Sequence, residues 1–200
     1  MFKNCQLNPQ TTGVMIYLIS GVLISFFCSW TIPIFLFAAF NFIWFGLASS
    51  LYYHRTLSHR AIEMTLPTEI FFLLGGLFGL GGDPIRWVAI HRYHHRNSDR
   101  PNDAHSPNTG LWYSYYGWVI RMDEKLVKPL RDHFCEDLNN RPLLRICRGP
   151  IMEGAPHLLF ASFICWKWGL DAVVLAIILP VVLTISFHWC LIASLCHSSA

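Results

Sequence analysis

The sequence predicts an all-α membrane protein with four transmembrane helices, arranged as two hairpins with a cytosolic helical cap that carries the histidine-rich segments. Hydrophobic residues make up 54% of the 200 residues and charged residues only 14%, with a mean hydropathy of +0.39. This composition is unlike that of a soluble domain. No charged residue occurs between Lys3 and Arg55, and most charges gather in the middle of the chain. The net charge of +3 is too small to indicate nucleic-acid binding.

The first predicted hairpin covers residues 14–53. As one helix this apolar stretch would measure about 60 Å at 1.5 Å per residue, twice the roughly 30 Å of a hydrocarbon core. Two passes therefore fit, with the turn at residues 29–33, because Pro33 suits the first turn of a new helix. A cleaved signal peptide over residues 1–28 is the alternative hypothesis, but the first apolar run ends without a small-residue cleavage site.

The polar middle of the chain, residues 54–148, is predicted to form the cap. It holds most of the lysine and arginine, which places it in the cytosol by the positive-inside rule. Its apolar segment 67–83 is too short to span and rich in glycine, so we expect it to lie on or dip into the membrane interface. The Trp- and Tyr-rich segment 110–120 is expected to rest against the headgroups. Four basic residues follow this segment: Arg121, Lys125, Lys128 and Arg131. We expect them to contact anionic lipid headgroups, the alternative being an anionic head of the substrate.

The second predicted hairpin covers residues 150–197, so that the chain forms one membrane domain. Two apolar runs are separated by Gly169-Leu170-Asp171, and two passes bring His197 back to the side of His54. The seven cysteines have no regular spacing, and several lie in apolar runs, so a disulfide framework is not expected.

The spacing of the central histidines is typical of metal ligands. His91, His94 and His95 stand at i, i+3 and i+4, which places them along one side of a helix. The adjacent His94 and His95 point about 100° apart, so this segment could serve two metal ions. His54 and His59 stand five residues apart, about 140° on an ideal helix. They reach a common centre only if the helix ends or loosens there.

Several segments resemble one known family. His54 to His59 form an HxxxxH motif, and His91 to His95 form HxxHH within the run W-V-A-x-H-R-x-H-H-x-x-S-D. Asp103-Ala104-His105-Ser106-Pro107 and Ser194-Leu195-Cys196-His197 follow. Together they closely resemble the membrane fatty-acid desaturases, in particular the delta-9 acyl-CoA or acyl-lipid branch and its bacterial members. The resemblance covers most of the chain, from about His54 to His197.

The resemblance implies an oxidoreductase that introduces a cis double bond into a saturated acyl chain, using dioxygen and two non-haem iron ions. It also implies an acyl-CoA or acyl-lipid substrate in an apolar tunnel, surrounding membrane lipids, and an electron donor of the ferredoxin or cytochrome type. Neutral imidazoles are good iron ligands, and the matching positions imply the ligands His54, His59, His91, His94, His95 and His197. Asp99 and Asp103 are candidates for orienting imidazole N–H groups, the alternative being solvated loop carboxylates.

Two features depart from the family pattern. Family members carry a third HxxHH box beyond the last pass, and the sequence stops at Ala200 without it. Ala193 stands where the pattern has an asparagine that helps hold a metal through water. The sequence thus predicts a C-terminally truncated chain whose activity is open. A non-catalytic desaturase remnant is one alternative hypothesis, and a related di-iron membrane hydroxylase is a second, which the W-V-A-x-H-R-x-H-H run disfavours.

The remaining histidines are given other roles. We expect a hydrogen-bonding role for His105, a surface position for His133, and a hydrated ring edge near a membrane boundary for His157. His188 lies inside the last apolar run and is expected to line a tunnel or pack rather than bind metal. The motifs do not identify the residues that bind substrate, the chain length, the bond position, the acyl carrier or the electron donor.

Overall fold

The computed structural model describes residues 7–98, 100, 103–110, 112–121 and 124–188, and within these ranges it contains helices and no strands. The helices of the first half are α1 (Pro9–Ser25), α2 (Ile32–Leu47), the π-helix η1 (Ala48–Ser58), α3 (Leu66–Phe78) and α4 (Pro84–Asn97). The later elements are η2 (Pro107–Thr109), η3 (Tyr113–Gly117), η4 (Val119–Arg121), α5 (Glu124–Phe134), α6 (Glu136–Asn139), α7 (Pro142–Ile146), η5 (Pro150–Glu153), α8 (Ala155–Val173), η6 (Val174–Ile178) and α9 (Leu179–Ser186).

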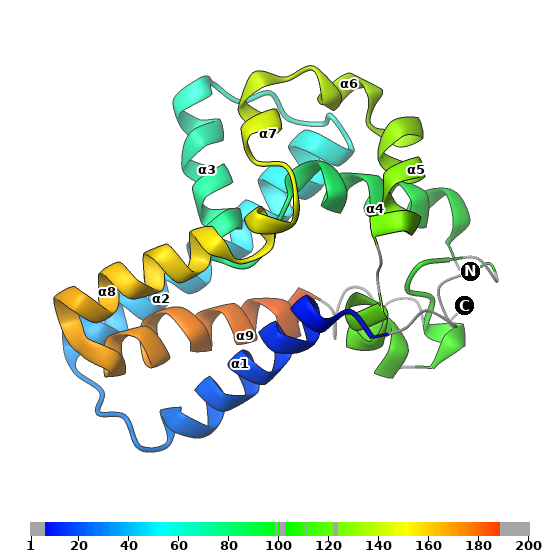
Figure 1. The fold of residues 1–200 in the computed structure, drawn as a ribbon. Coiled ribbons are helices and arrows are strands. Elements are labelled where there is room, and N and C mark those ends of the chain that lie inside the picture. Colours follow the sequence, from blue (N-terminus) through cyan, green and yellow to red (C-terminus); the bar gives the residue numbers. More distant parts are fainter. Residues whose placement is uncertain (1–6, 99, 101–102, 111, 122–123, 189–200) are drawn as a thin grey trace.

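The long helices form the two expected hairpins, and they lie side by side (Figure 1). The first hairpin turns between α1 and α2, where Thr31 caps the new helix through Ile34 N (3.4 Å) and Pro33 lies in its first turn. The second hairpin turns at Gly169, whose φ of +83° interrupts the helix assigned as α8. The two turns meet, because Ser29 N donates to Asp171 Oδ2 at 3.1 Å. The second turn lies at its predicted position, and the first, between Ser25 and Ile32, overlaps the predicted residues 29–33.

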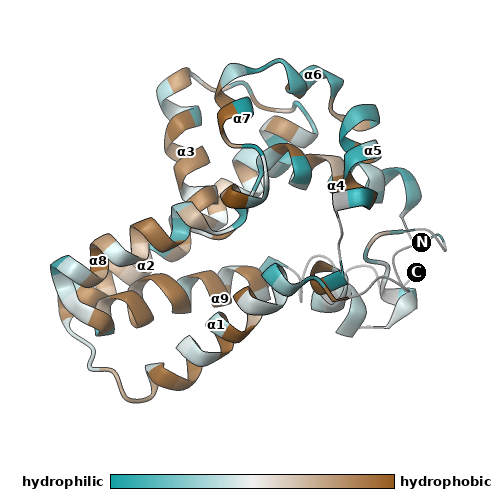
Figure 2. Cartoon of the chain, in the orientation of Figure 1, coloured by the Kyte–Doolittle hydropathy of each residue, from teal (hydrophilic) through white to brown (hydrophobic). Residues whose placement is uncertain are grey.

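These helices consist mostly of apolar residues (Figure 2). Phe26, Phe27 and Trp166 are 80%, 89% and 78% exposed, as in a protein surrounded by lipid rather than water. Within the described ranges, two helical stretches are long and apolar enough to cross a membrane, Ile32–Ser58 and Ala155–Ser186, while α1 and α3 are shorter apolar helices. The second stretch contains the turn at Gly169. These features are those of a membrane protein.

The cap is built from α3 to α7 at one end of the hairpins; α5 and α6 are far more polar than the hairpin helices, whereas α3 is apolar (Figures 1 and 2). Its core packs η1 against α4, with Tyr53, Leu57, Ile85 and Val88 almost fully buried. A buried amide also ties the hairpins together beneath it, because Asn41 Nδ2 donates to Ala176 O at 2.6 Å. This bond joins α2 to η6, and η1 continues directly from α2 into the cap.

His157 differs from its prediction. A hydrated ring edge was expected, but the side chain is fully buried. Its Nδ1–H donates to Phe78 O at 2.6 Å, and its Nε2 lies 3.0 Å from the Tyr17 hydroxyl, which donates to it. His157 thus links α8 to α3 and α1. Its partners lie 79 and 140 residues away, so the local sequence could not reveal them.

Candidate metal centre

The first pair of histidines is brought together by the π-helix η1. In this segment backbone hydrogen bonds run from residue i to residue i+5, as in His59 N to His54 O at 3.1 Å. The hydroxyl of Ser58 bonds Tyr53 O at 2.8 Å with the same spacing. Residues five apart are therefore stacked on one side, which resolves the 140° separation of an ideal helix. The expected loosening of the helix at His54 and His59 is confirmed.

The second group of histidines is carried by α4. Asp83 caps the helix by accepting from Ile85 N at 2.9 Å, and Pro84 occupies its first position. The fully buried Ile85, Val88 and Ala89 hold one face against the cap core. Each turn beyond this anchored start presents histidine, first at position 91 and then at positions 94 and 95. The buried first half of α4 thus sets the direction of the second.

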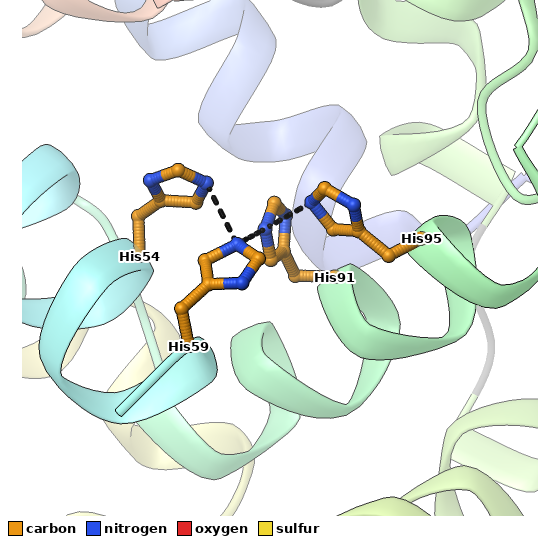
Figure 3. A group of neighbouring side chains, drawn as sticks. All are labelled: His54, His59, His91 and His95. Carbon is orange, nitrogen blue, oxygen red and sulfur yellow. Dashed lines mark hydrogen bonds between the residues drawn. The ribbon is translucent and has the colours of Figure 1, made fainter. Parts of the chain in front are cut away.

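His54, His59, His91 and His95 converge on one point (Figure 3), and we call this group the four-histidine centre. Their nearest ligand nitrogens all lie within 4.8 Å of one another. The Nε2 atom of His59 is 3.1 Å from that of His54 and 3.2 Å from that of His91, and the His91 and His95 Nε2 atoms are 3.0 Å apart. The Trp87 ring stacks on His91 with centroids 4.8 Å apart, which limits rotation of that imidazole.

These distances fit a single metal ion. With metal–nitrogen bonds of about 2.0–2.1 Å, neighbouring ligand nitrogens would lie roughly 2.9–3.4 Å apart. Burial, followed by the nearby His95, His54 and His59 rings, lowers the pKa of His91 to about 2. His91 is therefore neutral at physiological pH, which is the form that binds metal.

His94 faces a different group from the four-histidine centre. Its Nδ1–H donates to Asp103 Oδ1 at 2.7 Å, and the ring of His105 stacks on it with centroids 3.9 Å apart. His105 N also donates to Asp103 Oδ1, at 3.2 Å. Burial raises the pKa of Asp103, but the His94 hydrogen bond and the charges of His94 and His105 outweigh it and lower this pKa. Asp103 thus fixes the tautomer of His94, and His105 joins this pair through its backbone N–H and its stacked ring.

The structure therefore gathers four of the predicted ligands and separates a fifth. His197, the sixth, lies outside the described residues, as do Asp99 and Ala193. His133 is exposed, as predicted.

His188 lines the same cavity as His54, as its tunnel role predicted. Its Nδ1–H donates to Thr184 O at 3.1 Å, and its Nε2 is buried with no hydrogen-bond partner among the described residues. The sequence signal was a polar residue inside an apolar run.

A cavity of about 360 Å³ opens beside the histidines. Its wall is mostly apolar and is shared by α1, α3, α4 and α9. His54, His91, His94 and His95 line it together. Gly76 is also part of the wall and lets Tyr53 pack closely, because a Cβ there would lie 2.7 Å from the tyrosine ring. An apolar ligand in this cavity would lie against the imidazole groups.

Comparison with known proteins agrees with this arrangement. No family model matches the chain. It is 33% identical over 175 residues to the delta-9 acyl-lipid desaturase 1 of Arabidopsis thaliana, covering 81% of this chain and 56% of that protein. It is 34% identical over 159 residues to the delta-9 acyl-lipid desaturase 2 of the same plant, covering 76% and 48%. It is 32% identical over 151 residues to an acyl-CoA 5-desaturase of Anemone leveillei, covering 66% and 47%.

The chain spans about half the length of the curated relatives it matches. These relatives are named as acyl-lipid and acyl-CoA desaturases, which are oxidoreductases of lipid metabolism. The histidine motifs, the apolar helices and these identities agree: the chain belongs to the membrane fatty-acid desaturase family, of the delta-9 acyl-lipid and acyl-CoA type.

Proposed function

We propose that the chain takes part in desaturation, introducing a cis double bond of the delta-9 type into a saturated acyl chain. The observation that carries this proposal is the convergence of the four-histidine centre beside an apolar cavity. A cavity of this kind suits a hydrocarbon chain, and the relatives are named as desaturases of acyl lipids and acyl-CoA. The acyl carrier is accordingly acyl-CoA or a membrane lipid.

Two non-haem iron ions are the proposed cofactor. One is held by His54, His59, His91 and His95, whose nitrogen distances fit it. For the other, the sequence motifs propose His94, whose ring is oriented through Asp103, together with His197. When bound, such a pair activates dioxygen to remove hydrogen from an unactivated C–H bond. Trp87 and Asp103 hold the imidazole rings in orientation, and the apolar cavity wall keeps bulk water from the acyl chain.

The two hairpins support a proposal for the membrane arrangement. We propose that all four long helices cross the bilayer and that the cap, with its histidines, lies on the cytosolic side. Electrons come from a ferredoxin or cytochrome-type donor. Exposed cations of α5, Lys125 and Lys128, provide a surface for an acidic donor or for anionic lipid headgroups.

The direct test is to express the chain with an electron donor in cells lacking their own desaturase and to analyse their acyl chains. We expect monounsaturated acyl products and iron in the purified protein. Iron-free protein together with no new product would contradict the proposal and support a non-catalytic chain. Hydroxylated acyl products would instead identify a hydroxylase.

The cavity wall provides a prediction about chain length. Val14 of α1 lines the cavity, so Val14→Phe is expected to shorten the space for the acyl chain. One methylene in an apolar pocket is worth about 1–3 kcal/mol. The ratio of product from the longest accepted acyl chain to product from shorter chains should therefore fall about tenfold. Ile16→Phe is the matched control, because Ile16 is 62% exposed on the same helix. Equal product profiles for Val14→Phe and Ile16→Phe would show that this cavity does not hold the acyl chain.

Asp103 provides a prediction about metal affinity. Asp103→Asn removes the carboxylate that accepts from His94, and its amide can donate instead, which favours the wrong His94 tautomer. We expect the affinity of the site at His94 to fall about 10–100-fold. Iron content after dialysis against a chelator measures this loss. Asp132→Asn, an exposed change on α5, serves as control. Unchanged iron retention in Asp103→Asn would show that this carboxylate does not support a metal ligand.

A further inference from the structure

Arg92 follows His91 on α4, and its guanidinium contacts three segments of the cap. Nε donates to Ser58 O at 3.0 Å and Nη2 to Leu57 O at 2.7 Å, both at the end of η1. Nη1 donates to Phe134 O at 2.6 Å at the end of α5. Nη1 and Nη2 also donate to the two oxygens of Asp137, at 2.7 and 3.1 Å. These bonds use all five N–H donors of the guanidinium.

The two carbonyls at the end of η1 have a special position. Leu57 and Ser58 directly precede His59, and carbonyls in the last turn of a helix lack partners within it. Arg92 supplies those partners from α4, one residue from His91. The guanidinium therefore connects the backbone that carries His59 to the backbone that carries His91, whose Nε2 atoms are 3.2 Å apart.

We infer that Arg92 is a positioning residue for the four-histidine centre, holding the last turn of η1 against α4 so that the two histidine pairs stay within reach of one metal ion. This inference rests on the proposed function, because it assumes that the centre binds metal. Arg92 does not contact the metal. It acts through the backbone of Leu57 and Ser58.

Asp137 fixes the guanidinium from its other side. Its carboxylate is bidentate with Arg92 and also accepts from Arg60, at 3.0 Å from Nε and 2.8 Å from Nη2. Burial raises the pKa of Asp137, but the hydrogen bonds and charges of Arg92 and Arg60 outweigh it and lower this pKa. The carboxylate is thus ionised at neutral pH. The Arg60 side chain is 65% exposed, and it bonds Asp137 through Nε and Nη2.

The test compares Arg92→Lys with Arg60→Lys in the full chain in detergent micelles, titrated with Co(II). Lysine keeps the charge but has three donors and no planar fork, so it cannot bond both carbonyls and Asp137 as Arg92 does. We expect Arg92→Lys to weaken Co(II) affinity by about 10–100-fold and to change the Co(II) absorption spectrum. Arg60→Lys should match the wild type in both, because it alters only an exposed ion pair.

The outcomes separate the inference from the proposed function. Absence of Co(II) binding by the wild-type chain would contradict the metal centre itself. Wild-type binding with the same affinity and spectrum in folded Arg92→Lys would overturn the role of Arg92 alone. If Arg92→Lys does not fold, Asp137→Asn replaces it, since this variant keeps the three carbonyl bonds of Arg92. We then expect a several-fold weaker affinity, and wild-type affinity in Asp137→Asn would overturn the inference.

Discussion

His91→Ala is expected to abolish metal binding at the four-histidine centre, and desaturation with it. The Nε2 of His91 lies 3.2 Å from that of His59 and 3.0 Å from that of His95, so His91 connects the two histidine segments. Without it the site keeps only three of its four nitrogens, an incomplete ligand set. We expect metal affinity to fall by more than the roughly 100-fold that follows loss of a supporting group.

Iron content and acyl products measure this effect in the same preparation. His133→Ala is the matched control, because His133 is exposed on α5 and lies outside the two histidine clusters. It should keep both the iron and the product of the wild type. A His91→Ala protein that retains wild-type iron content would show that the four nitrogens do not act as one ligand set.

Arg86→Met is expected to cause the largest loss of stability. Arg86 Nη1 lies 2.9 Å from Glu153 Oε1, and the two side chains are only 14% and 19% exposed. This pair joins the first turn of α4 to η5, just before α8. Removing one member of a buried pair leaves the other charge uncompensated, which costs about 3–5 kcal/mol. The thermal midpoint in detergent micelles measures this loss.

The effect of Arg86→Met should depend on pH. Burial raises the pKa of Glu153 even though Arg86 lowers it, so loss of Arg86 raises it further. A carboxyl group with a raised folded-state pKa binds more protons when folded than when unfolded. Stability therefore falls as pH rises from the ordinary pKa through the raised one. The destabilisation should be smallest at low pH.

A double variant provides the control for this pair. Arg86→Met with Glu153→Gln removes both charges and should be more stable than Arg86→Met alone at neutral pH. Its midpoint should also depend less on pH than that of the single variant. If the single and double variants had the same midpoint at neutral pH, the buried charge of Glu153 would not be the cause of the loss.

The hairpins and their turns could be predicted because hydropathy and local residue preferences determine them. The uncharged run before Arg55 is too long for one pass, and Pro33 and Gly169 have backbone preferences that place the turns. Because residues 67–83 were not expected to span the membrane, the histidine motifs before and after them were predicted to lie at the same end of the hairpins. The burial of His157 could not be predicted, since Tyr17 and Phe78 reach it only after the helices pack.

The histidines that the structure gathers were named from the sequence, but their arrangement could be predicted only in part. The five-residue spacing of His54 and His59 indicated a loosened helix, and the π-helix η1 provides it. The angle between His94 and His95 indicated two sites, and His94 indeed faces Asp103 instead of the four-histidine centre. Arg92 is part of the W-V-A-x-H-R-x-H-H run, but the motif assigned it no role. Its role depends on carbonyls of η1 and on Asp137, 45 residues away, which only the folded cap brings near.

X-ray absorption at the iron edge tests the central claim most directly, that His54, His59, His91 and His95 hold one ion and His94 belongs to another site. With the protein loaded with one iron, the wild type should show a shell of about four imidazole nitrogens near 2.1 Å. His94→Ala should keep that shell, whereas His91→Ala should lose it. A shell that disappears in His94→Ala and persists in His91→Ala would contradict the account.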